Sequence, residues 1–244
     1  MHSIRRRLLP GAALALAGPL RAAGAEPLQV LVDGSTELPQ ALVRGDTVVD
    51  GLQHNLAVEI GRRVGRSVQF RLLPRRRIAA ALLDGEADMI CGYQPAWLSG
   101  PLRWSHPFLD DGDLLVTAAR HGAPTRLRDV AGQRIGTIAG FVYPELEQRL
   151  GSGFVRDDAP NLSSNLRKLA NRRVDHAVIG RTNFEYLLRR GELPVEVHAP
   201  LPIAQWRNGC ALSPRTPLSL AALNAAIMAM QADGSLKRIR DRYR

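Results

Sequence analysis

A loop rich in aromatic and polar residues lies near the middle of the chain, at residues 91–108, with the sequence CGYQPAWLSGPLRWSHPF. It follows an apolar run that is typical of a buried strand, and it carries Tyr93, Gln94 and Trp97 in a chain with 5% aromatic residues. Aromatic rings beside a few polar groups are the usual lining of small-molecule sites. We therefore expect these three side chains to face a binding site, whereas Trp104 suits the packing of a turn.

Patterns for catalysis and metal binding are weak in comparison. No Ser-His-Asp or Cys-His arrangement is visible, and the six histidines are scattered without a His or Cys pair at metal-ligand spacing. Glu37, with Asp33 behind it, is the carboxylate that we would nominate as a general acid or base. We expect a binding protein without a metal, a cofactor or catalytic activity.

The first 25 residues have the features of a secretory signal peptide. Arginines at positions 5–7 precede a short apolar run at 8–20, and Ala23-Gly24-Ala25 supplies the small residues of a cleavage site. We predict cleavage before Glu26 and a periplasmic location. The arginine pair Arg5-Arg6 leaves twin-arginine export open beside ordinary secretion.

The positive charge of the chain does not indicate a nucleic-acid partner. The formal net charge of the chain is +10. Residues 1–25 hold four arginines and no acid, so the net charge of the remaining residues is +6. The remaining basic residues are dispersed rather than gathered in a stripe with aromatic neighbours. A nucleic-acid-binding surface has such a stripe, so we expect no nucleic-acid partner.

Apolar periodicity predicts alternating strands and helices after residue 25. Short alternating or apolar runs predict strands, and apolar residues three or four apart predict helices. The strands are expected at 28–32, 68–73, 87–91, 114–118, 134–138, 154–155 and 176–179, and the helices at 52–64, 78–85, 140–150, 164–170, 184–188 and 220–230. The order is typical of a parallel sheet covered by helices, and it occurs twice, with a break near residues 110–125.

An ordered set of short motifs resembles one protein family. The motifs are Gly51-Leu52, Gly85-Glu86-Ala87-Asp88, Trp104-Ser105-His106-Pro107-Phe108, Gly132-Gln133-Arg134-Ile135-Gly136, Arg173-Val174-Asp175 and Ala232-Asp233-Gly234-Ser235. Together they resemble the bacterial periplasmic solute-binding proteins of family 3, the polar amino acid class. The match covers essentially all of the chain after the signal peptide, and its specificity lies in the order of the motifs.

The resemblance implies a two-lobed α/β fold of the type II periplasmic-binding class. Each lobe is then a mostly parallel sheet flanked by helices, with two crossover strands between the lobes and the ligand in the cleft. We expect lobe 1 at 26–112 plus 207–244, and lobe 2, including the crossovers, at 113–206. The function implied is capture of a small polar solute by lobe closure. The protein would be a monomer and would deliver the solute to an ABC-type permease of the inner membrane.

The same architecture makes neighbours of the strands that carry the two cysteines of the chain. Cys91 ends the third strand, and Cys210 lies on the strand expected at 203–212, which returns to lobe 1. An oxidising compartment permits a disulfide, and we expect one if the two Cα atoms lie within about 7 Å.

The ligand contacts implied by the resemblance are altered in this chain. The family has an arginine that clamps an amino acid's carboxylate where this chain has Leu98 and Ser99, and Arg103 lies too close to the following turn to replace it. The family also has an aspartate for the amino group after the strand at 176–179, where this chain lacks an acid and has Arg181 beside the position. We therefore expect an anionic or neutral polar solute, since a guanidinium and a helix start at Gly140 both favour anions.

The residues expected to contact the solute come from loops of both lobes. They are Asp33, Glu37, Arg77, Tyr93, Gln94, Trp97, Gly140, Phe141, Arg181 and Asn183. Arg77 belongs to Pro74-Arg75-Arg76-Arg77 at a helix start, where each cation opposes the helix dipole by about 0.3–1 kcal/mol. An anion-binding edge and a solvated basic corner are the two interpretations of that segment.

Two other functions stay open at this point. Stand-alone lobed proteins similar to this family also serve as accessory or sensor partners of periplasmic systems, and a cleft filled by its own side chains would favour that role. Some relatives are periplasmic dehydratases, for which Glu37 would have to act as the acid or base.

Overall fold

Parallel strands form the first lobe in the computed structural model, which describes residues 26–243. β1 (Leu28–Asp33) lies between β4 (Val68–Leu73) and β5 (Met89–Tyr93) and runs parallel to both. Helix α1 (Leu52–Arg63) precedes β4, and α2 (Arg75–Leu83) connects β4 to β5. Because the three strands run parallel, they all end at the same edge of the sheet.

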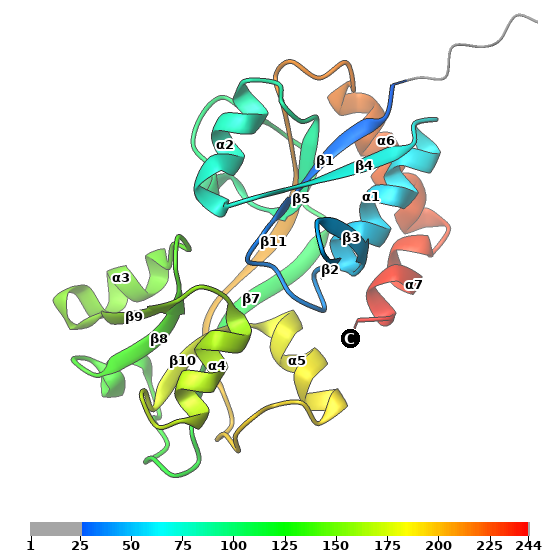
Figure 1. Ribbon diagram of the computed structural model, residues 1–244. Helices are drawn as coiled ribbons and strands as arrows, with labels where there is room; N and C mark the ends of the chain where they lie inside the picture. The colour runs from blue at the N-terminus through cyan, green and yellow to red at the C-terminus, as the bar shows by residue number, and fades with distance from the viewer. Residues whose placement is uncertain (1–25, 244) are drawn as a thin grey trace, which may run out of the picture.

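The second lobe repeats this arrangement. β8 (Arg134–Ile138) pairs in parallel with β9 (Val155–Ala159) and with β10 (His176–Gly180). The helices of this lobe are α3 (Pro144–Leu150), α4 (Leu162–Ala170) and α5 (Arg181–Arg190). Figure 1 shows these elements as one group and those of the first lobe as another.

Two long antiparallel strands, β7 (Leu109–Thr117) and β11 (Leu201–Leu212), join the lobes (Figure 1). β11 also pairs with β5 of the first lobe, and β7 pairs with β10 of the second. A Cβ at Gly112 would lie 2.3 Å from the Ala204 carbonyl oxygen, so the close pairing of the crossovers requires glycine there. The two-lobed α/β fold is confirmed. The lobe boundaries expected at 112/113 and 206/207 fall inside these strands and stay a prediction.

Apolar residues on both faces of the sheets form the core. In the first lobe one cluster contains Leu56 and Met89 and another contains Ile78 and Ile90. The second lobe likewise has one cluster with Val116 and one with Ile135. Within residues 26–243, no helix is long and apolar enough to cross a membrane.

Several predicted boundaries are wrong. β7 begins at Leu109 rather than 114, because the acidic stretch before it pairs with β11. Helix α3 begins at Pro144 rather than 140, since Gly140 adopts a positive φ of 79° in the preceding turn. The β2–β3 hairpin (Leu42–Arg44 and Thr47–Asp50) is absent from the prediction, because such short strands with exposed faces give no apolar alternation. The remaining short elements are β6 (Arg103–Trp104) and the 3₁₀ turns Pro95–Trp97, Leu127–Val130 and Gly151–Gly153.

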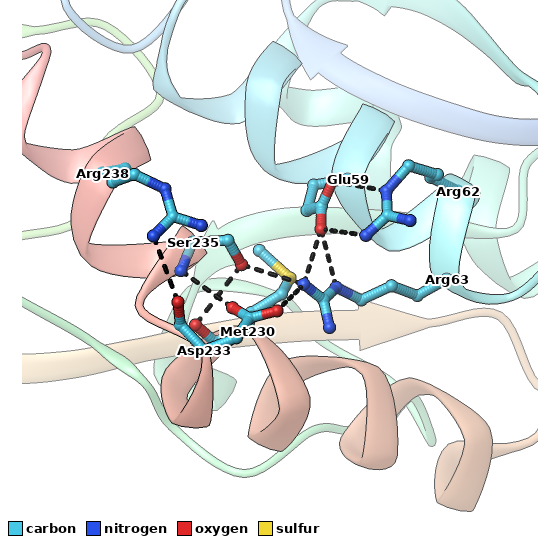
Figure 2. A network of polar contacts seen from close by, with 7 residues as sticks. All are labelled: Glu59, Arg62, Arg63, Met230, Asp233, Ser235 and Arg238. Carbon is cyan, nitrogen blue, oxygen red and sulfur yellow. Dashed lines mark hydrogen bonds and ion pairs between the residues drawn. The ribbon is translucent and has the colours of Figure 1, made fainter.

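The C-terminal helices α6 (Leu220–Ala232) and α7 (Ser235–Asp241) return to the first lobe. Figure 2 shows the polar network that holds α7 against α1: the Arg63 guanidinium lies between Glu59 and Asp233, at 2.7 and 2.6 Å. Arg63 also donates to the Ser235 hydroxyl at the start of α7. These contacts bring the C-terminal residues near the cleft described below.

The expected disulfide between Cys91 and Cys210 is present, with an S–S distance of 2.01 Å. The two residues are partners in the antiparallel pairing of β5 with β11, and their Cα atoms lie 4.0 Å apart. The bond therefore joins the returning crossover to the sheet of the first lobe. The expected signal peptide, residues 1–25, lies outside the described residues.

Removal of this disulfide is expected to lower the free energy of unfolding substantially. It closes a loop with a sequence separation of 119 residues, and a crosslink of that span restricts the unfolded chain by about 2–5 kcal/mol. Urea unfolding of the Cys91→Ala/Cys210→Ala protein, compared with oxidised and reduced wild type, measures this loss. A change below about 0.5 kcal/mol, the size of an ordinary surface substitution, would contradict the prediction.

Candidate functional site

Three polar side chains meet where β1, β4 and β5 end. Asp33 is the last residue of β1, Arg75 follows β4 at the start of α2, and Tyr93 is the last residue of β5. The Arg75 Nη1 lies 3.1 Å from the Tyr93 hydroxyl and 3.5 Å from the Asp33 carboxylate. The sheet order β4-β1-β5 thus places the three groups together, at the edge where open α/β sheets bind their ligands.

Arg75 is enclosed by aromatic rings. Its guanidinium carbon lies 4.0 Å from the ring centre of Phe141, 5.0 Å from that of Tyr93 and 5.5 Å from that of Trp97. Phe141 belongs to the second lobe, so this contact crosses the cleft. Both polar contacts of the guanidinium use Nη1, which leaves Nε and Nη2 as donors within the part of the chain that the structure describes. Burial raises the pKa of the Tyr93 phenol.

The crossover strands supply acids and a second tryptophan. Asp110, Asp111 and Asp113 of β7 and Trp206 of β11 line the cleft. Trp206 packs edge-on against Trp97 with ring centres 5.3 Å apart. The Asp111 carboxylate accepts hydrogen bonds from the backbone N–H and the hydroxyl of Thr182, both at 3.1 Å, and thereby ties β7 to α5.

Asp113 differs from the other carboxylates of the cleft. Among the described residues it has no hydrogen-bond or ion-pair partner, whereas Asp110 pairs with Arg207 at 3.0 Å. Burial, then the charges of Asp111 and Glu145, raise the pKa of Asp113 to about 8, against the opposing effect of Arg75. The carboxyl group is therefore mostly protonated at neutral pH.

Glu37 connects the two lobes directly. Its carboxylate accepts a hydrogen bond of 2.8 Å from the backbone N–H of Ser163, in the first turn of α4. The side chain of Asn161 accepts from the neighbouring Ser164 N–H at 2.9 Å. Both contacts satisfy N–H groups that have no partner inside the helix, and the Glu37 charge also suits the helix dipole.

A cavity of about 140 Å³ lies between these elements and is lined from both lobes. Three buried polar atoms in its lining have no hydrogen-bond partner: Gln53 Oε1, Trp206 Nε1 and Asn208 Oδ1. Buried polar groups are nearly always hydrogen-bonded, so these three atoms are exceptions within the cavity wall. Within residues 26–243, no three His, Cys, Asp or Glu side chains are grouped to hold a metal ion.

Five of the ten expected site residues line this cavity. They are Glu37, Tyr93, Trp97, Phe141 and Asn183. Asp33 lies behind the wall, 1% exposed, and positions Arg75. Gln94 and Gly140 are not part of the lining.

The basic residues differ most from expectation. Arg77 is exposed, because two residues of helix turn its side chain away from Arg75, which reaches the cavity instead. Arg181 is outside the lining, where Thr182 and Asn183 of the same helix are found. The preference for an anion was based on Arg181 and a helix start at Gly140, and neither feature is present in the cavity.

Sequence reasoning missed several residues of the site, namely Arg75, Asp111, Asp113, Tyr143, Thr182 and Asn208. A usable signal existed for the two acids. Asp111 and Asp113 are two residues apart before an apolar strand, so a strand extended over them carries both on one face. A signal also existed for Arg75, which lies three residues before Ile78 and seven before Leu82 and so shares their helix face if the helix is extended to it.

The sequence pattern described as bacterial extracellular solute-binding proteins, family 3, matches residues 28–244. The chain belongs to this family. This confirms the resemblance carried by the ordered motifs. No curated protein sequence matches the chain significantly.

Solved structures share the fold of this solute-binding protein at low sequence identity. An ancestral arginine-binding protein bound to arginine has 20% identity and a TM-score of 0.74, with 89% of this chain and 97% of that chain covered. An ancestral amino acid-binding protein, a precursor of cyclohexadienyl dehydratase, has 15% identity, a TM-score of 0.75 and coverage of 89% and 95%. An ABC uptake transporter substrate-binding protein from Streptococcus pneumoniae with bound histidine has 18% identity, a TM-score of 0.73 and coverage of 89% and 92%.

Replacement of Glu37 by alanine is expected to favour an open arrangement of the lobes. The substitution removes the charged acceptor of the Ser163 N–H, an exposed contact that we value at about 1 kcal/mol, or about a fivefold change in the ratio of open to closed protein. Small-angle X-ray scattering of the solute-free protein should show a larger radius of gyration. Glu185→Ala, which removes an exposed acid of α5, is the matched control. An unchanged radius for Glu37→Ala would contradict the role given to this contact.

Asp113→Asn is expected to stabilise the solute-free protein in a pH-dependent manner. The folded protein holds the Asp113 proton up to a pH of about 8, whereas the unfolded chain releases it near 3.8. Wild type therefore loses stability as the pH rises between these values, and the variant lacks this loss. We expect the variant to melt higher by at least about 2–4 °C at pH 9, and by less at pH 5. Equal effects at both pH values would contradict the prediction.

Proposed function

We propose that the protein binds a small amino acid, or a similar zwitterion, in the cleft between its lobes. The observation that carries this proposal is the cation in the cavity wall: Arg75, with Nε and Nη2 available, stands among Phe141, Tyr93 and Trp97. A guanidinium with two free donors suits a carboxylate, which it can bind through two parallel hydrogen bonds. The aromatic rings then enclose the apolar part of the solute.

In the family an arginine of the loop after the third strand binds the carboxylate, and this chain has no arginine at that position. Arg75 takes its role. Leu98, at the expected position, is buried in the core of the first lobe. The Arg103 guanidinium donates to the Ser213 carbonyl oxygen at 2.8 Å and is thus occupied elsewhere. The carboxylate anchor then comes from the start of α2 instead of from the loop after β5.

A solute with both charges suits the rest of the cavity better than an anion. The wall carries Glu37, Asp110, Asp111 and Asp113 besides Arg75 and Arg240. An anion alone would meet this excess of carboxylates, whereas an ammonium group is attracted to it. The similar proteins described above as bound to arginine and to histidine also support an amino acid.

The biological role that we propose is capture of this solute in the periplasm for an ABC-type permease, by a monomer whose lobes close on the solute. Catalysis is not part of the proposal. Glu37, the acid expected to act in an enzyme, holds the N–H of Ser163 across the cleft. The dehydratase alternative would require turnover by the purified protein.

A thermal-shift screen of residues 26–244 against the common L-amino acids, singly, tests the proposal. A solute at 100-fold excess over its dissociation constant should stabilise the protein by about 2.7 kcal/mol. Arg75→Met should weaken binding of that solute by about 30-fold or more, because the carboxylate loses its charged partner. Arg77→Met, on the same helix but exposed, should bind as wild type does.

The screen also separates the alternatives. Binding that Arg75→Met leaves unchanged would remove Arg75 from the site. A protein that no amino acid stabilises would contradict the proposal and favour a partner protein, in which Arg75 itself fills the cleft.

A further inference from the structure

Asp113 is the carboxylate of the cavity without an assigned structural contact. Glu37 accepts from Ser163, Asp110 pairs with Arg207, and Asp111 accepts from Thr182. Asp113 lines the same cavity, and no described residue is a hydrogen-bond or ion-pair partner for it. Asp113 is partly buried, and a charged carboxylate there without a partner is costly, so a cationic group of a ligand would supply the partner that it lacks.

The surroundings of Asp113 favour an incoming cation. On its own strand Asp111 adds a negative charge, Glu145 of α3 adds another, and Arg75 of α2 provides the opposing positive charge. The neighbouring strands present Gly180 of β10 and Ala204 of β11 opposite Asp113, and neither carries charge. Tyr143, the remaining titratable group that interacts with it, keeps its proton because burial raises its pKa.

We propose that Asp113 accepts the ammonium group of the solute, and that a proton leaves the site when it does so. This inference rests on the proposed function and names the group that recognises the solute's amine. Without solute, Asp113 is mostly a neutral acid at pH 7, because burial and its acidic neighbours raise its pKa to about 8. An ammonium beside it favours the carboxylate, and the released proton passes to the solvent.

The proposal makes the amine a condition for tight binding. A carboxylate without an amino group leaves Asp113 protonated and unpaired, and it displaces no proton. A zwitterion uses Arg75 and Asp113 at once, so an amino acid should bind tighter than its deamino analogue by about tenfold or more.

Isothermal titration calorimetry tests this, with the common L-amino acids as probes and, for each that binds, its deamino analogue. Titrations at about pH 7 in PIPES and in ACES, whose ionisation enthalpies differ, report the protons exchanged. Wild type should release about nine-tenths of a proton per solute, the protonated fraction of a group with a pKa of about 8. Asp113→Asn should release almost none and bind about tenfold or more weakly, with the preference for the amine reduced. Asp46→Asn, an exposed acid in the β2–β3 hairpin, should behave as wild type does.

The outcomes separate this inference from the proposed function. Amino acids that bind wild type without proton release, or bind Asp113→Asn as tightly as wild type, overturn the role of Asp113 alone. If no amino acid binds wild type, the proposed function fails, and this inference fails with it. The proton count of wild type needs no variant, so the test holds even if Asp113→Asn does not fold.

Discussion

The site depends on a guanidinium held in an unfavourable position. Arg75 stands at the first turn of α2, where the helix dipole opposes a cation, and its side chain is 11% exposed. Taking such a charge out of water costs several kcal/mol unless it is paired. Asp33 of β1 and Tyr93 of β5 provide that compensation together with the rings of Trp97 and Phe141. The sheet order β4-β1-β5 brings these strand ends together. The chemistry of the site therefore depends on the strand order of the first lobe.

The same guanidinium links the lobes. Phe141 of the second lobe has the ring centre nearest to it, and Glu37 of the first lobe contacts the start of α4. The crossover strands act between them: Trp97 packs on Trp206, and Asp111 binds Thr182 at the start of α5. Closure is thus stabilised by a few polar and aromatic contacts around a small cavity rather than by a continuous apolar interface. Contacts of this strength are compatible with the lobe opening and closing that we propose, since each contributes on the order of 1 kcal/mol.

The order of strands and helices could be predicted from the sequence because the apolar faces of buried elements repeat with clear periods, as in β1 and α1. The disulfide was expected from the architecture that the family resemblance implies, in which β5 and β11 are neighbours. The site was harder to predict. Whether Arg75, Arg76 or Arg77 points inward depends on the phase of α2, which its packing sets through Ile78 and Leu82. The acidic start of β7 was interpreted as a loop because charged residues rarely occur in a strand. Its pairing with β11, which makes this segment a strand, cannot be seen in the local sequence.

Arg75 and Asp113, the two groups that we propose to bind the charges of the solute, differ in whether they can become neutral. A guanidinium cannot lose its charge at physiological pH, so Arg75 needs Asp33 beside it whether or not a solute is present. Asp113 has no such partner among the described residues, but it can take a proton instead, and its surroundings favour that state. Without a solute, Arg75 and Asp33 therefore form an ion pair and Asp113 is a neutral acid, so neither of these two groups carries an uncompensated charge. A zwitterion turns the acid into a carboxylate and supplies the cation for it in the same step. Recognition of the amine then adds a charge pair to the site at the moment when the lobes exclude water from it, which is when such a pair is strongest.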